Sequence, residues 1–340
     1  MAKSNAVSAK VRALYGVRLN KDDYDELLSK RSVGEIAGYL KRCEAYKNLL
    51  YDVKENSIHR GQLELLMRKD LYEKMISLMN YADSKEKAFY RFPIIYAEIK
   101  FLLSKIIHLM NENNDKIDFI STIPMYINGY TTYNLINVAK SESFNSLFEN
   151  LKESKYYIIL QLNISNNEVN YVNLEKDLFK YYYEYIFDNM EKINKSSRKE
   201  LLDMFNSEIE LNNIIKIYRL KKYYNLDDGI IEENLLDTNS RFKKSKLVNM
   251  MKDKHCEEFI KELINNKYKI TIDENNNLEN AVDTQVFAKA KKMLIYSTNA
   301  NSVYTSYYYL HLLEIKNVIN IIEGIRYSRN IDDISCKLVY

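Results

Sequence analysis

One helical segment occurs twice in this chain, about a hundred residues apart. The first copy, EIELNNIIKIYRLKKYY, starts at Glu208, and the second, EIKNVINIIEGIRYS, starts at Glu314. An alignment without a gap pairs the following residues: Glu210 with Glu314, Asn213 with Asn317, Ile215 with Ile319, Ile217 with Ile321, Lys222 with Arg326, and Tyr223 with Tyr327. Any two amphipathic helices share apolar positions by chance, so the Glu, Asn, basic and Tyr matches carry the evidence for an internal repeat.

The apolar spacing of this segment predicts an α-helix that is packed on two faces. The first face consists of Leu211, Ile214, Ile215 and Tyr218, at the i, i+3, i+4 and i+7 positions of one helix side. The second face consists of Asn213, Ile217, Leu220 and Tyr224. A helix with two such faces lies inside a domain, because both faces must be removed from water.

A weaker third copy, YAEIKFLLSKIIHL, lies a similar distance upstream, with Glu98 at the Glu210 position. Phe101 stands where the other copies have Asn, so only the Glu and the apolar face agree. Pro93 is placed to open this helix, where its missing N–H leaves no intrahelical bond unmade. The seven residues that mark the repeat are Glu98, Glu210, Asn213, Lys222, Glu314, Asn317 and Arg326.

The repeat predicts an all-α protein of three similar helical domains, at about residues 1–118, 119–232 and 233–340. Only 7 Gly and 2 Pro occur in 340 residues, so few positions can break a helix. Local signals place helix starts at the Ser197–Glu200 capping box and at Asp22 and Asp23. Asn-rich stretches at 111–115, 163–170 and 273–280 are predicted surface connections, and YKITI at 268–272 is the one predicted short strand.

The charge, the cysteines and the apolar runs of the sequence indicate which kind of partner the protein binds and in which compartment it lies. The net charge is only +3, which argues against nucleic acid or an acidic membrane as a partner and favours proteins. Three widely spaced cysteines, Cys43, Cys256 and Cys336, indicate no disulfide framework. The first twenty residues carry charges in place of an apolar signal segment, and no apolar run approaches the roughly 18 residues of a membrane span. We expect a cytoplasmic protein.

The sequence contains no pattern for catalysis, a cofactor or a metal. Its glycines are scattered singly, and neither of two phosphate-binding loop patterns, G-x-x-x-x-G-K-[ST] and G-x-G-x-x-G, occurs in the sequence. We therefore expect no ATP hydrolysis. His255 and Cys256 are adjacent and would point in different directions on a helix, while the other histidines lie far from cysteines. A Cys–His nucleophile pair is left open by the sequence, but nothing marks one. The prediction is no catalytic residue, no cofactor, no metal and no small-molecule ligand.

Two further features have both a structural and a functional interpretation. The aromatic runs at 180–187 and 306–313 resemble base-stacking platforms, but acidic neighbours favour packing in the core. Asn213 and Asn317 interrupt an apolar face, where a polar side chain must be hydrogen-bonded. Either each Asn fixes the register of its helix, which we favour, or it makes a polar contact in a binding cavity.

Four segments taken together resemble one known family, the V-type ATPase subunit d family, whose archaeal and bacterial members are called the C subunit of rotary ATPases. They are NAVSAKVRALYGVRLNKDDYDELL from Asn5, HRGQLE at 59–64, EIELNNIIKIYRLKKYYNL from Glu208 and EIKNVINIIEGIRYSRNID from Glu314. The resemblance covers nearly the whole chain in order, although none of these segments is a catalytic signature.

The resemblance implies a funnel of three similar helical domains on the cytoplasmic face of the membrane rotor ring. It implies that the protein has no chemistry of its own and joins the central shaft subunits, of D/F type, to that ring during proton or sodium transport. Membrane contact would occur only through the ring. Two other hypotheses remain: a generic helical-repeat scaffold that binds proteins, and an enzyme whose site the sequence does not mark.

Overall fold

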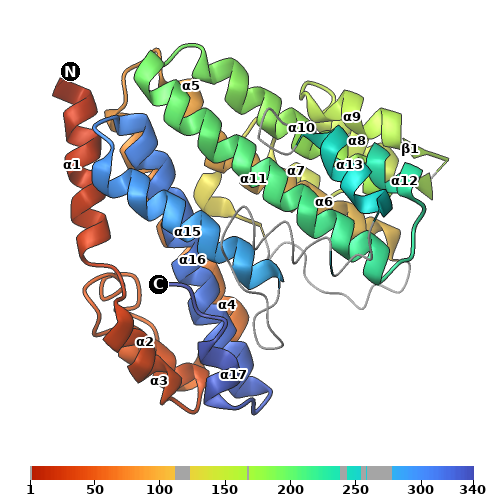
Figure 1. Ribbon diagram of the computed structural model, residues 1–340. Coiled ribbons are helices and arrows are strands. Elements are labelled where there is room, and N and C mark those ends of the chain that lie inside the picture. Colours follow the sequence, from red (N-terminus) through yellow and green to blue (C-terminus); the bar gives the residue numbers. More distant parts are fainter. Residues whose placement is uncertain (1, 112–122, 167, 238–242, 254–257, 259–277) are drawn as a thin grey trace. The chain divides into compact units, whose positions relative to one another are not determined.

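The computed structural model describes residues 2–111, 123–166, 168–237, 243–253, 258 and 278–340 (Figure 1). These residues are mostly α-helical, which confirms the all-α prediction. They divide into two compact units. The first comprises Met1–Asp83, Asn194–Glu232 and Asp237–Tyr340, and the second comprises Ser84–Ile193 and Glu233–Leu236. The division into three domains near residues 118 and 232, and their funnel arrangement, remain predictions.

The first unit is built around one long helix near the end of the chain. Its helices are α1 (Ala2–Gly16), α2 (Lys21–Leu28), α3 (Val33–Leu40), α4 (Arg60–Tyr81), α11 (Lys195–Lys222), α13 (Lys244–Asp253), α15 (Leu278–Tyr296), α16 (Ala300–Arg326) and α17 (Ile331–Ser335). A short helix, α12 (Asp228–Glu233), ends where the second unit takes up the chain. Helix α16 contacts α1, α2, α4, α11, α15 and α17. Its first fifteen residues include almost no exposed side chain, so α16 forms the centre of this unit.

The second unit contains the other long helices and a small hairpin. Its elements are α5 (Lys87–Tyr90), α6 (Phe92–Met110), α7 (Leu135–Ala139), α8 (Phe144–Leu151), α9 (Tyr156–Asn163), β1 (Ile164–Ser165), β2 (Glu168–Val169) and α10 (Tyr171–Met190). Strands β1 and β2 pair antiparallel, with Ile164 opposite Val169. The hairpin therefore lies in a stretch that was predicted to be a simple connection, and Asn166, at φ 52°, supplies its left-handed turn. The YKITI segment lies outside the described residues.

Two predicted helix starts are displaced in the structure. Helix α11 begins at Lys195, and the side chain of its N-cap, Asn194, accepts from the N–H of Ser196, so the predicted capping box at Ser197 is wrong. Because Asn194 caps the helix, Ser197 lies inside its first turn, where it is buried. Helix α2 is capped by Asn20, while Asp23 completes the capping box. Pro93 does lie in the first turn of α6, as predicted.

The three helices that carry the repeated Glu show the same burial pattern. Leu102 of α6, Ile214 of α11 and Val318 of α16 occupy one equivalent position, and each is fully buried. Asn213 and Asn317 on the second face are also buried. The prediction of a helix packed on two faces is therefore confirmed for the middle of both closely matched copies, but Tyr224, which was predicted on the second face, is 69% exposed.

Each Glu-bearing helix can be paired with a long helix that it contacts, namely α6 with α10, α11 with α15 and α16 with α4, although α16 also packs on α11 and α15. In the first two pairs the partner helix follows the Glu-bearing helix in sequence, whereas α4 lies more than two hundred residues before α16. The third helix pair is therefore assembled from the beginning and the end of the sequence. With this pairing, the order of helices in the repeat is circular, because the last helix pair begins with α16 near the end of the sequence and is completed by α4 near its start. The comparison of single helices in the sequence did not reveal this order.

Both aromatic runs lie in the core, as predicted. Tyr182 and Tyr183 of α10 are buried, and Tyr182 packs edge-on against Tyr96 of α6. Tyr307, Tyr308 and Tyr309 of α16 are buried as well. Neither run forms an exposed stacking surface for bases, because the rings that would form it face other helices.

Candidate functional site

The repeated glutamates are buried in the helical core. Glu98 and Glu210 have 0% of their surface exposed, and Glu314 has 6%. A buried carboxylate is costly unless hydrogen bonds or charges compensate for its lost hydration. The contacts of these side chains therefore decide whether the repeat has a common structural purpose.

Glu314 joins α16 to the N-terminal part of the chain. Its Oε2 accepts a hydrogen bond from the backbone N–H of Leu19 at 3.0 Å, and its Oε1 accepts one from the hydroxyl of Tyr46. Leu19 directly precedes Asn20, the N-cap of α2, and Tyr46 follows α3. One carboxylate thus holds both ends of the α2–α3 segment against α16.

Glu98 makes the same two kinds of contact in the second unit. Its Oε1 accepts from the backbone N–H of Thr132, and its Oε2 accepts from the hydroxyl of Tyr156 at 2.8 Å. Thr132 lies two residues before Asn134, the N-cap of α7, and Tyr156 follows α8. Glu98 and Glu314 therefore hold a pair of short helices in the same manner, and the Glu match in the repeat has a physical basis.

Burial raises the pKa of Glu98 and the pKa of Glu314, and the backbone and tyrosine hydrogen bonds offset part of that rise. Burial and the nearby carboxylates also raise the pKa of Tyr46 and of Tyr156 well above the ordinary value of tyrosine. Both tyrosines therefore stay protonated and donate to the carboxylates. In each arrangement the tyrosine hydroxyl is the donor and the carboxyl group is the acceptor.

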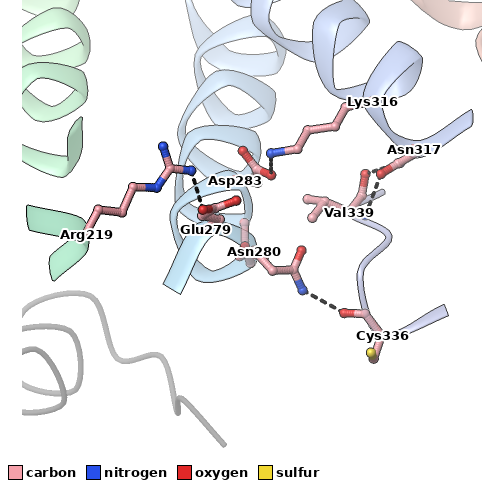
Figure 2. Close-up of polar contacts among 9 residues, drawn as sticks. Arg219, Glu279, Asn280, Asp283, Lys316, Asn317, Cys336 and Val339 are labelled. Atoms are coloured by element: carbon pink, nitrogen blue, oxygen red, sulfur yellow. Dashed lines mark hydrogen bonds and ion pairs between the residues drawn. The ribbon is translucent and has the colours of Figure 1, made fainter. Parts of the chain in front are cut away.

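Asn317 holds the C-terminal segment on α16, as Figure 2 shows. Its Oδ1 accepts from the N–H of Val339 at 3.0 Å, and its Nδ2 donates to the carbonyl of the same residue at 2.7 Å. The side-chain amide thus pairs with both polar backbone groups of Val339. Asn213, the equivalent residue of α11, is also buried, with 2% of its surface exposed.

Helix α15 is connected by polar contacts to α11, α16 and the C-terminal segment (Figure 2). Arg219 of α11 pairs with Glu279 of α15, and Lys316 of α16 pairs with Asp283 of α15. Asn280 donates to the carbonyl of Cys336 at 2.6 Å. These contacts fix the start of α15 between the two closely matched repeat helices.

The basic members of the repeat, Lys222 and Arg326, lie in the last turns of α11 and α16. A cation is favourable there because the helix C-terminus carries partial negative charge. Their neighbours Tyr223 and Tyr327 are 67% and 64% exposed, and each cation lies within about 6 Å of its neighbouring ring. The repeat therefore preserves an exposed basic–Tyr pair at two helix ends.

A buried polar group around His311 was not predicted from the sequence. Its Nε2 lies 3.6 Å from Oδ2 of Asp70, and its Nδ1 lies 3.1 Å from the hydroxyl of Tyr307. Burial lowers the pKa of His311 to about 3, so the ring is neutral near pH 7. Asp70 accepts from Lys74 at 2.5 Å. No sequence signal joined these residues, since they come from α4 and α16.

The described residues contain no group of three or more His, Cys, Asp or Glu side chains that could hold a metal ion. Neither Cys43 nor Cys336 forms a disulfide bond, and His255 and Cys256 lie outside the described residues. Within the ranges that the structure describes, no helix is long and apolar enough to cross a membrane. The candidate site is thus a set of structural contacts and exposed surfaces.

Comparison with known proteins agrees with the resemblance found in the sequence. Residues 7–335 match the family described as ATP synthase (C/AC39) subunit. The C subunit of the A-type ATP synthase of Methanosarcina mazei is 24% identical over 262 residues, which cover 76% of this chain and 69% of that protein. The protein of the same name from Methanosarcina barkeri shows the same identity and coverage. Because the family match spans almost the whole sequence, the chain belongs to the ATP synthase (C/AC39) subunit family.

Proposed function

We propose that this protein is a non-catalytic subunit of the central stalk of an A/V-type rotary ATPase, where it couples the central shaft to the membrane rotor ring. The family match over residues 7–335 is the observation that supports this most strongly. The proposed partners are the shaft subunits and the ring, at the cytoplasmic face of the membrane. The proposal includes three similar helical domains arranged as a funnel around the shaft.

A torque-transmitting subunit must resist deformation between its two attachment points. Helices that are buried on two faces supply stiffness, because close-packed cores have low compressibility. Helix α16 meets this requirement, since it contacts six other helices of its unit. The Glu314 and Asn317 contacts further tie it to the segments before α2 and after α17. These features support a mechanical role.

The proposal is tested by loosening the core and measuring hydrolysis and pumping on the same preparation. Ile214 is fully buried, so Ile214→Asp places an unpaired carboxylate in the core at a cost of several kcal/mol. Ion pumping by the enzyme reconstituted with this variant should fall away, while ATP hydrolysis by the catalytic head should persist. The matched control is Asn212→Asp, which adds a carboxylate at an exposed position of the same helix and should pump normally.

Full pumping by an enzyme whose Ile214→Asp subunit is demonstrably unfolded or absent would remove the coupling role. Purification of the native protein without any shaft or ring subunit would favour the generic protein-binding scaffold. ATP turnover by the isolated protein that disappears on mutation of one of its residues would favour an enzyme.

A further inference from the structure

Helices α11 and α15 enclose a half-open hollow of about 290 Å³ between them. Its lining residues are Met204, Ser207, Glu208 and Leu211 from α11 and Gln285, Val286, Ala288, Lys289 and Lys292 from α15. We call this hollow the α11–α15 groove. Most of its lining surface is apolar, while Lys292 is exposed at its edge. All of it lies in the first unit.

The same place in the α16–α4 pair can be identified through the repeat. The buried residues of α4 and of α15 show the same spacing, with Leu63, Met67, Tyr72, Met75 and Met79 corresponding to Leu278, Val282, Phe287, Ala290 and Leu294. In this register Ser77 corresponds to Lys292, and Tyr81 corresponds to Tyr296. On the Glu-bearing helices, His311 corresponds to Ser207.

Helix α1 fills the corresponding place in the α16–α4 pair. It contacts both helices, and its Val7 and Val11 are buried. Lys10 of α1 donates to the hydroxyls of Ser77 and Tyr81, at 3.3 Å each. With α1 in place, the space beside His311 and Glu314 is only about 20 Å³. The α11–α15 groove has the same position in its helix pair, but none of the described residues of α1 or of any other third helix lines it.

We propose that the α11–α15 groove binds an amphipathic helix of a partner protein, seated as α1 is seated on α16 and α4, with a carboxylate facing Lys292. A helix that lays its apolar side into such a groove is a common mode of recognition. The partner helix would present small aliphatic side chains like those of α1 to Met204, Leu211 and Val286.

Charge decides which kind of helix fits. The hydroxyls of Ser77 and Tyr81 receive the ammonium of Lys10 in the α1 seat, but Lys292 occupies the Ser77 position in the groove. An ammonium at that place would meet a like charge, whereas an Asp or Glu would form an ion pair. Helix α1 of a second copy is therefore disfavoured, and the occupant is a helix with an acidic residue where α1 has Lys10.

The test uses two labelled peptides and the full-length protein. One peptide has the sequence of residues 2–18, and the other carries Lys10→Glu in that sequence. Fluorescence anisotropy should show tighter binding of the Lys10→Glu peptide, by about two- to five-fold, as expected for one partly exposed ion pair. The Lys292→Glu protein should reverse this preference. The control Lys199→Glu makes the same charge change at an exposed position of α11 that does not line the groove, and should leave the preference unchanged.

Filling the groove provides a second test that does not depend on charge. Ser207→Trp and Ala288→Phe place large rings in the hollow from opposite helices, and either should weaken the Lys10→Glu peptide about ten-fold or more. Circular dichroism identifies the variants that remain folded. Because the chain contains no tryptophan, the indole introduced by Ser207→Trp also reports its own burial.

The proposal would be overturned by no binding of either peptide, by binding that a folded groove-filling variant does not weaken, or by a preference that Lys292→Glu does not change. Tighter binding of the unaltered peptide would point to α1 of a second copy as the occupant and would overturn it as well. The peptide measurements use no ATPase activity, so they are independent of the proposed coupling role.

Discussion

Glu314 accepts a hydrogen bond at 3.0 Å from the backbone N–H of Leu19, a residue near the other end of the sequence. The bond is buried, and the hydroxyl of Tyr46 donates to the same carboxylate. Glu98 makes an equivalent pair of contacts with Thr132 and a tyrosine in the second unit. Two members of the repeat, Glu98 and Glu314, therefore make the same kind of contact, in which the carboxylate of a long helix holds a pair of short helices.

Glu314→Leu should destabilise the protein by about 2–5 kcal/mol, because it leaves the Leu19 N–H and the Tyr46 hydroxyl buried without their acceptor. Chemical denaturation of the full-length variant measures this loss. Glu323→Gln is the matched control on the same helix. Glu323 is 43% exposed and pairs with Arg60 at the surface, so its replacement should cost at most about 1 kcal/mol. Equal losses in the two variants would contradict the structural importance of the buried carboxylate.

Stability should depend on pH through the buried carboxyl groups. The folded pKa of Glu314 is raised by burial, so the folded state binds its proton more readily than the unfolded chain does. Its contribution to stability is fully present below the unfolded pKa of about 4.3 and is lost as pH rises through the folded pKa. Glu314→Gln cannot titrate, so the stability of the native protein relative to this variant should fall as pH rises. Denaturation curves at a series of pH values measure the stability of both proteins. If the native protein became more stable relative to Glu314→Gln as pH rises, the expected sign would be refuted.

Asn317→Leu should release the C-terminal segment from α16. The substitution removes both hydrogen bonds to Val339 and should cost about 1–3 kcal/mol. Asn317→Asp keeps the acceptor for the Val339 N–H, but it places a buried carboxylate oxygen against the Val339 carbonyl and should therefore also release the segment. Hydrogen exchange at the Val339 amide should accelerate strongly in both variants. Unchanged exchange in both variants would show that other contacts hold the segment.

Gly324→Ala should destabilise the protein although Ala is the better helix former. A Cβ at this position would lie 2.4 Å from Cδ1 and Cγ1 of Ile334, which is buried where α17 packs on α16. Displacing Ile334 should cost about 1–3 kcal/mol, against a helix-propensity gain of about 1 kcal/mol. In an Ile334→Ala background the same substitution should become neutral or stabilising. A double-mutant cycle measures this coupling, and additive effects would show that the two residues do not interfere.

The sequence by itself determined the class of fold and the helices that repeat. Apolar spacing along α11 and α16 predicted two buried faces, because helical periodicity is a property of neighbouring residues. The Glu and Asn matches marked positions where a polar group lies in a core, and the family resemblance followed from the order of four segments. Local propensity was less reliable at the element ends: Asn20 and Asn194 form the caps, and the hairpin occurs at Asn166.

Only the tertiary structure decided what the marked residues contact. Leu19 and Tyr46 reach Glu314 because helices from both ends of the sequence pack together, and no local pattern encodes such a distant pairing. The α11–α15 groove likewise depends on two helices more than fifty residues apart, and it becomes recognisable only because α1 fills the same place beside α16. Helix formation is governed by nearby residues, whereas the choice of partners is governed by the packing of the whole core.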